Sequence, residues 1–148
     1  MWLAALASES LPLYAPPGRT ATVLHEGDKF AQGKWDLPVG KSDPGEPISE
    51  TAVHELRVET GLIVKTEALQ AAHIIHGAWG VEAPNGFLIV FFVAHERIGD
   101  PENREPKKHA QVRWVDANAT PEEFVDTTAS ALRCHLTGGP QVSLSGWR

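Results

Sequence analysis

A glycine-containing loop that leads into an acidic, amphipathic helix constrains this chain more than any other part of its sequence. Residues 47–60 have the pattern of a helix, because Pro47 suits its first turn and Gly61 suits its C-terminal cap. On a helical wheel Glu55 and Glu59 lie about 40° apart, on one face and one turn from each other. Two like charges beside apolar positions are unfavourable unless a cation neutralises them. The pair is compatible with a divalent-metal site, since carboxylate oxygens suit magnesium, and an ordinary amphipathic surface helix with solvated glutamates is the alternative.

The bulk composition limits the classes of protein to which the chain can belong. It has 148 residues, of which 42% are hydrophobic, and this is enough for one well-packed domain. A formal net charge of -6 argues against nucleic-acid and anionic-membrane partners, which would need a basic face. The chain has one cysteine, Cys134, and no apolar run approaches the roughly 20 residues of a membrane span. We therefore expect a cytoplasmic protein with no nucleic-acid or membrane partner.

β-forming runs on both sides of the acidic helix predict a mixed sheet. Residues 87–94 are almost continuously apolar, which is typical of a central strand that is buried on both faces. A second helix is expected to begin with a capping box at Thr120 and to extend to about residue 137. The order of elements indicates a single α/β domain. Further short strands are expected at residues 20–25, 35–38, 62–64, 72–75 and 112–115.

The two ends of the chain differ in composition from its middle. Residues 1–19 are rich in proline and alanine and predict an extended arm or an edge strand. Residues 138–148 begin with two glycines and a proline, and they are expected to form a C-terminal tail. The domain itself is therefore expected to occupy residues 20–137.

The loop and the acidic helix resemble the signature of the Nudix hydrolase superfamily, G-x5-E-x7-R-E-U-x-E-E-x-G-U, in which U is aliphatic. Residues 35–38 (Trp-Asp-Leu-Pro) are also similar to a W-x-L-P segment that is common just before this signature. Two positions differ, because His54 replaces the arginine and Val58 replaces a metal-binding glutamate. The resemblance implies a Nudix-type α/β/α sandwich with a mixed β-sheet. The remaining signature positions are matched by Gly40, Glu46, Glu55, Leu56, Glu59, Gly61 and Leu62.

The resemblance also implies a Mg2+- or Mn2+-dependent pyrophosphohydrolase of a small-molecule nucleotide or nucleoside-diphosphate derivative. In the family the metal is held by the helix carboxylates and by a backbone carbonyl just before the signature glycine. The candidate catalytic and metal-binding residues are thus Glu55 and Glu59, with the carbonyl of Val39 as a further metal ligand. Val58 cannot bind a metal, so the activity is expected to be weak or divergent. Residues expected to support the loop and helix are Gly40, Glu46 and His54.

A later charged loop supplies the remaining candidates. Residues 103–114 resemble a stretch of many Nudix nucleotide hydrolases in which a glutamate helps to hold metal or water. Glu105, Lys108 and His109 could here replace that glutamate as base and phosphate contacts, and a solvated charged loop is the alternative. His73 could line a substrate pocket, but its alternation with apolar residues favours a place on a sheet face.

Two leading functions remain open on the sequence alone, and a third, a plain interaction module, gains weight only if no metal binds. One is the hydrolysis described above. The other is a Nudix-fold protein without hydrolase activity, which binds a ligand or performs non-hydrolytic chemistry in the same cleft. A homodimer is compatible with both functions.

Overall fold

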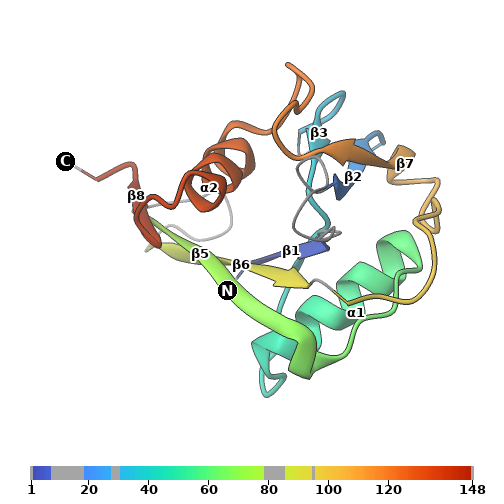
Figure 1. The fold of residues 1–148 in the computed structure, drawn as a ribbon, viewed down its shortest axis with the longest axis horizontal. Helices are drawn as coiled ribbons and strands as arrows, with labels where there is room; N and C mark the ends of the chain where they lie inside the picture. Colours follow the sequence, from blue (N-terminus) through green and yellow to red (C-terminus); the bar gives the residue numbers. More distant parts are fainter. Residues whose placement is uncertain (1, 8–18, 28–30, 79–85, 95, 148) are drawn as a thin grey trace, which may run out of the picture.

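The computed structural model describes residues 2–7, 19–27, 31–78, 86–94 and 96–147. Within these ranges the chain forms two β-sheets, two α-helices and a short 3-10 turn (Figure 1). In chain order the elements are β1 (Trp2–Ala7), β2 (Arg19–His25), β3 (Trp35–Asp36), β4 (Val39–Lys41), α1 (Ile48–Thr60), η1 (Thr66–Ala68), β5 (Leu69–Gly77), β6 (Phe87–Ala94), β7 (His109–Asp116), α2 (Asp126–Leu136) and β8 (Val142–Ser145).

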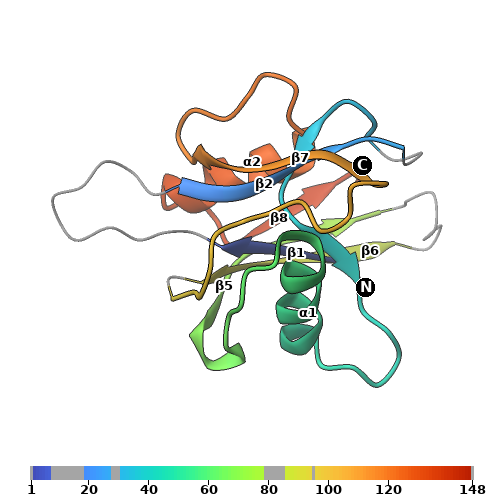
Figure 2. The ribbon, with the colours of Figure 1, turned by 90° about the vertical axis from the view of Figure 1, so that its right-hand side faces the viewer.

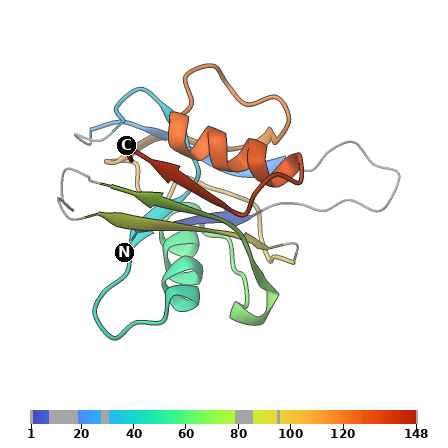
Figure 3. The ribbon, with the colours of Figure 1, turned by 90° about the vertical axis from the view of Figure 1, so that its left-hand side faces the viewer.

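The larger sheet lies between the two helices, and the smaller sheet lies on the same side of it as α2 (Figures 1 and 2). The larger sheet has the strand order β4-β1-β6-β5-β8, and the smaller sheet has the order β3-β2-β7. Two pairs, β1–β6 and β5–β8, are parallel and the other pairs are antiparallel, so the larger sheet is mixed. Helix α1 lies below the larger sheet in Figures 2 and 3, whereas α2 and the smaller sheet lie above it. This arrangement confirms the predicted α/β sandwich with a mixed sheet.

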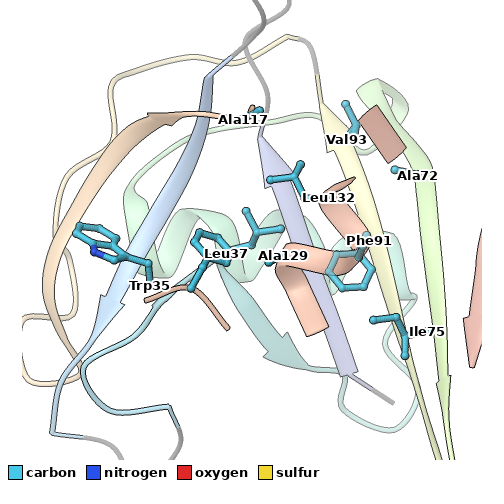
Figure 4. Close-up of a cluster of buried hydrophobic side chains, with 11 residues drawn as sticks. Trp35, Leu37, Ala72, Ile75, Phe91, Val93, Ala117, Ala129 and Leu132 are labelled. Atoms are coloured by element: carbon cyan, nitrogen blue, oxygen red, sulfur yellow. The ribbon is translucent and has the colours of Figure 1, made fainter. Parts of the chain in front are cut away.

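Strand β6 carries the core on both of its faces. Phe91 and Val93 belong to one buried cluster, which also contains Leu132 of α2 (Figure 4). Phe92 and Ala94 alternate with them and belong to a second cluster, which packs against α1. Each large apolar side chain that is fully buried stabilises the fold by roughly 1.5–3 kcal/mol. The apolar run of residues 87–94 is therefore explained, since neither face of this strand meets water along its second half.

The start of α2 differs from the sequence prediction. The capping box at Thr120 does not begin a helix, and α2 begins only at Asp126. The preceding residues instead form a bridge to β3, in which Trp35 N donates to Glu123 O at 2.7 Å and Val125 N donates to Trp35 O at 2.8 Å. The bridge buries Phe124 in the core, and this tertiary contact outweighs the local helix signal.

The two end segments also differ from the sequence prediction where the structure describes them. Strand β1 lies between β4 and β6, inside the larger sheet, whereas an arm or an edge strand was expected for residues 1–19. Its apolar sequence suits a strand with neighbours on both sides. Residues 8–18 of that segment are outside the described residues. Within the expected tail, β8 extends the sheet beside β5, and for residues 62–64 only the bridge Ile63–Ile98 is formed.

Two further observations concern single elements. Among the described residues, neither α1 nor α2 combines the length and hydropathy that a membrane-crossing helix needs. His73 of β5 is buried, and its Nε2 lies 2.8 Å from the Ser143 hydroxyl of β8. This histidine therefore packs inside the sheet, as its alternation with apolar residues predicted.

Candidate active site

Helix α1 places its two carboxylates at the edge of the core. The helix begins after Pro47 and ends at Gly61, which adopts the left-handed conformation (φ 76°) that favours glycine. Leu56 and Ala52 anchor one face of the helix in the core, and Glu59 is buried beside them. Glu55, one turn earlier, is half-buried. The carboxylates therefore border the core, as the helical wheel predicted.

The Glu59 carboxylate is held by the chain but remains electrostatically unfavourable. Its Oε2 accepts a hydrogen bond of 3.1 Å from the backbone N–H of Val39 in β4. Burial raises the pKa of Glu59 well above its ordinary value of 4.5, and the negative charges of Glu55, Glu105 and Asp36 raise it further. A single backbone hydrogen bond opposes these effects, so the ionised form needs a nearby cation.

Gly40 leaves room for Glu55. A Cβ atom at position 40 would lie 2.2 Å from Cγ of Glu55 and 2.7 Å from its Oε2, which is far inside contact distance. The group that lies against this glycine is therefore the side chain of a candidate metal ligand. Burial is also the main cause that raises the pKa of Glu55 above 4.5.

The other loop-helix candidates occupy different environments. The Glu46 Oε2 accepts a hydrogen bond of 2.7 Å from the hydroxyl of Thr51, a buried residue of α1, so Glu46 links the loop to the helix. His54 is exposed, and its charge when protonated lowers the pKa of Glu55. Val58 is 36% exposed and has no oxygen to offer. The helix itself thus supplies two carboxylates to the site.

The loop before β7 brings its charged residues to the same place. Lys108 Nζ lies 3.2 Å from Glu105 Oε2. The hydrogen bond to Glu105 raises the pKa of Lys108 above 10.5, and the negative charges of Glu105, Glu59 and Glu55 raise it further. His109 differs from its two neighbours because its ring is buried, with Nε2 4.0 Å from Glu59 Oε1. Lys108 and Glu105 can therefore meet a substrate, whereas His109 faces a candidate metal ligand and not a phosphate in solvent.

This loop is also attached to the end of α1. The backbone N–H of Glu102 donates to Thr60 O at 2.9 Å, and that of Arg104 donates to Glu59 O at 3.4 Å. These two backbone hydrogen bonds therefore hold the loop that carries Glu105 and Lys108 against the end of α1, next to Glu59.

Two residues of the site were not predicted as functional. His25 of β2 and Asp36 of β3 are both buried, and His25 Nε2 lies 3.1 Å from Asp36 Oδ2. Asp36 is also close enough to Glu59 to raise the pKa of that carboxyl. The sequence does show a titratable residue at the end of each of these two strands. It does not show that the two residues contact each other.

The donor set fits a hard divalent cation. Within the described ranges, no three His, Cys, Asp or Glu side chains are arranged to hold an ion by themselves. Mg2+ does not need such a cage, because it keeps several waters and binds through one or two carboxylates together with substrate phosphates. The raised pKa of Glu59 shows that the site would gain from a positive charge. Two adjacent carboxylates in an acidic environment therefore match the requirements of this ion.

Comparisons with known proteins agree with the fold. The profile of the NUDIX domain matches residues 10–133. The MutT NUDIX hydrolase of Burkholderia pseudomallei superposes with a TM-score of 0.71 at 21% identity and covers 88% of this chain and 95% of that one. The MutT protein of Methanosarcina mazei also gives 0.71, at 18% identity, and covers 93% of this chain and 92% of that one.

Two relatives match in sequence over shorter segments. The Nudix hydrolase YvcI of Bacillus subtilis is 26% identical over 105 residues, which are 67% of this chain and 65% of that protein. A nudix hydrolase of Caenorhabditis elegans is 32% identical over 57 residues, which are 38% of this chain and 16% of that protein. The chain thus spans less than two thirds of either relative. The domain match, which covers most of the chain, and the structural likeness together show that this protein belongs to the NUDIX domain family.

Proposed function

We propose that this protein is a divalent-metal-dependent pyrophosphohydrolase of nucleotides or of nucleoside-diphosphate-linked compounds. The observation that carries the proposal is the buried Glu59 carboxylate, which is surrounded by the further negative charges of Glu55, Glu105 and Asp36. Such a cluster destabilises the ionised site when no cation is present, and it favours an ion that also binds phosphate oxygens. Membership of a family named for its hydrolases supports the same reaction class.

Glu55 and Glu59 are the proposed catalytic and metal-binding residues, and the backbone carbonyl of Val39 is a further proposed ligand. Mg2+ is the expected ion, and Mn2+ has the same preference for oxygen ligands. When bound, such an ion neutralises charge that develops on the phosphate oxygens during attack by water. Gly40 keeps the space that Glu55 occupies, and the Val39 N–H orients Glu59.

Lys108 and Glu105 are the proposed contacts to substrate and water. The carboxylates around Lys108 keep its ammonium group charged, and a charged ammonium attracts the phosphates of the substrate. Glu105 is half-buried and lies beside Lys108, where it can accept a proton from the attacking water. These two residues lie on the loop that was expected to supply the base and the phosphate contacts.

The substrate class, the location and the assembly are further parts of the proposal. We propose a small-molecule substrate, a cytoplasmic location and assembly as a homodimer. Support for the homodimer comes from apolar side chains that are exposed at the β8 edge of the sheet, namely Val142, Leu144 and Trp147. Light scattering of the purified protein measures the assembly, and a mass equal to one chain would contradict the homodimer.

A metal titration followed by a substrate screen tests the proposed function. Mg2+ or Mn2+ at millimolar concentration should raise the melting temperature of the wild type, because an ion that binds only the folded state stabilises it. Phosphate release should then be measured with nucleoside diphosphates, nucleoside triphosphates and nucleotide sugars. Absence of any metal-induced shift would contradict the hydrolase. Metal binding without turnover of any of these compounds would favour the alternative of a non-hydrolytic protein in the same fold.

A further inference from the structure

A continuous row of buried polar side chains lies behind the candidate metal site. It consists of Asp36 in β3, His25 in β2, His109 in β7 and Glu59 in α1, and we call these four residues the polar row. Their exposed fractions are 1%, 5%, 2% and 6%, in that order. His25 Nε2 lies 3.1 Å from Asp36 Oδ2, the two imidazole rings meet edge to face at 5.6 Å, and His109 Nε2 lies 4.0 Å from Glu59 Oε1.

The backbone of the smaller sheet fixes the first three members of the row. His25 and His109 are directly opposite each other in the β2–β7 ladder, at a register shift between Leu24 and His25. Such an irregularity re-aims the side chain that follows it. Asp36 is fixed separately, because its Oδ1 accepts a hydrogen bond of 2.8 Å from the Leu37 N–H. The Nδ2 of Asn103 donates to the His109 carbonyl at 2.8 Å.

Burial makes the members of the row depend on one another. A buried carboxylate is stable only when it is paired or hydrogen-bonded, and the same holds for a buried imidazolium. The arginine of the family signature could supply a permanent charge next to the helix glutamates, but His54 occupies that position here and is exposed. On its buried side Glu59 instead faces His109, whose Nε2 is an ionisable nitrogen.

We propose that the first three members of the row are positioning residues, which hold the Glu59 carboxylate in place for a metal ion. Asp36 fixes His25, His25 supports the His109 ring by its edge-to-face contact, and the His109 ring limits where the Glu59 carboxylate can move. Side chains that touch a metal ligand and not the metal are known to set the orientation and the affinity of that ligand. The inference rests on the proposed function, since it assigns the row to the same metal site.

Two substitutions interrupt the row without removing a metal ligand. Asp36→Asn retains an oxygen for the Leu37 N–H but presents an amide to His25, so it alters the contact within the row and keeps the backbone contact. His25→Gln retains a polar group within reach of Asp36 and removes the ring that supports His109. The matched control is His73→Gln, because His73 is equally buried, with 2% exposed, but its hydroxyl partner lies in β8.

The test measures Mn2+ binding without substrate, by the electron paramagnetic resonance signal of the free ion, for variants whose circular dichroism shows that they are folded. Asp36→Asn and His25→Gln should each weaken Mn2+ binding by about 10- to 100-fold, and His73→Gln should bind as the wild type does. At saturating Mn2+ the kcat of both variants should return towards the wild-type value, whereas their apparent affinity for the ion should stay lower. If Asp36→Asn does not fold, His25→Gln carries the same comparison.

Two results overturn the inference, and a third separates it from the proposed function. Wild-type affinity in both row variants would show that the row does not position Glu59. An equal loss in His73→Gln would show a general effect of buried histidines on stability. If the wild type itself binds no Mn2+, the proposed function fails together with the inference, whereas binding by the wild type with unchanged row variants refutes the inference alone.

Discussion

Two parts of the molecule bury histidines among β-strands, and they differ in what surrounds the imidazole. His73 has a neutral hydroxyl partner in Ser143 and a tilted contact with the ring of Phe91, at 6.2 Å between centroids. In the polar row, His25 and His109 lie next to the carboxylates of Asp36 and Glu59. Burial alone therefore does not distinguish a structural histidine from one that belongs to a site. The charge of its neighbours does.

The difference has an energetic meaning. The contact between β5 and β8 gives the Nε2 of His73 a neutral partner within the sheet, and no carboxylate is its hydrogen-bond partner there. The region around Glu59 concentrates negative charge where water is excluded, and like charges in such a place are unfavourable until a cation arrives. The first region should therefore respond to mutation through stability, and the second mainly through metal binding.

Glu59→Gln tests this contrast with the largest expected effect. The amide oxygen can still accept the Val39 N–H, but the negative charge is lost. We expect loss of the metal-induced rise in melting temperature and a fall in kcat/KM of more than about 100-fold, because a ligand should matter more than its neighbours. The metal-free variant should melt at a higher temperature than the metal-free wild type at neutral pH, since a buried charge has been removed.

Glu50→Gln is the control for that variant, because Glu50 is an exposed carboxylate in the first turn of the same helix. It should leave both the metal response and the activity unchanged. If Glu59→Gln still responds to Mg2+ as the wild type does, the charge of Glu59 is not needed for metal binding. The contrast between the region around Glu59 and the region around His73 would then be wrong.

Gly40→Ala compares a glycine beside the proposed metal site with a glycine in the turn before β8. The new Cβ would overlap the Glu55 side chain, with 2.2 Å to Cγ, so Glu55 must move away from the site. Gly139, in the turn that connects α2 to β8, would meet its nearest atom at 3.4 Å, so Gly139→Ala is a matched control. We expect about 10- to 100-fold weaker Mn2+ binding for Gly40→Ala. Isothermal titration measures both variants, and equal affinities would contradict the assigned role of Glu55.

Val58→Glu adds a carboxylate where the family signature has one. Val58 is 36% exposed, so the longer polar side chain should be tolerated. We expect roughly tenfold tighter Mn2+ binding together with a gain in turnover, because a third oxygen ligand becomes available. Val58→Gln has nearly the same shape without the charge and should show neither effect. Good native activity without any gain in Val58→Glu would instead indicate that Glu105 already performs this role.

The pH dependence of the metal-free protein should have opposite signs in the two regions. The pKa of Glu59 is raised by burial, so its contribution to stability is present below pH 4.5 and is lost as the pH rises through the folded-state value. The pKa of His73 is lowered by burial, so its contribution is present above pH 6.5 and is lost as the pH falls through the folded-state value. One group changes the free energy of unfolding by up to about 1.4 kcal/mol per pH unit.

Melting temperatures in a chelator, from pH 5 to 8, measure these two contributions. The melting temperature of the wild type minus that of Glu59→Gln should fall as the pH rises. The melting temperature of the wild type minus that of His73→Gln should rise with pH until about pH 6.5. Slopes of the same sign would show that burial and the neighbouring negative charges do not raise the pKa of Glu59. Millimolar Mg2+ should flatten the first difference, because a bound cation favours the ionised carboxylate.

The parts that could be predicted from the sequence depend on local spacing. Helix α1 is determined by Pro47, Gly61 and the positions between them, and its predicted limits agree with the structure within one residue. Strand β6 was predicted with the same limits as observed, because an apolar run of this length has few alternatives. The pairing of Glu55 with Glu59 likewise follows from the rise of one helical turn.

The parts that could not be predicted depend on contacts between distant segments. The late start of α2 results from a bridge between Trp35 and Phe124, and the sequence around neither residue predicts this contact. His25 and Asp36 become neighbours of Glu59 only after β2, β3 and β7 have formed one sheet. Their role depends on that register, which the sequence around each of them does not specify.

The two backbone bonds between the loop before β7 and the end of α1 have a consequence for protein engineering. Substrate range is often altered by exchanging a loop for one of another length or sequence. Here the exchanged segment would include Glu102 and Arg104, whose amides bind the last carbonyls of the metal-site helix. A replacement loop must provide the same two donors at the same spacing. Otherwise a change that is intended for the substrate will also displace Glu59, the proposed metal ligand.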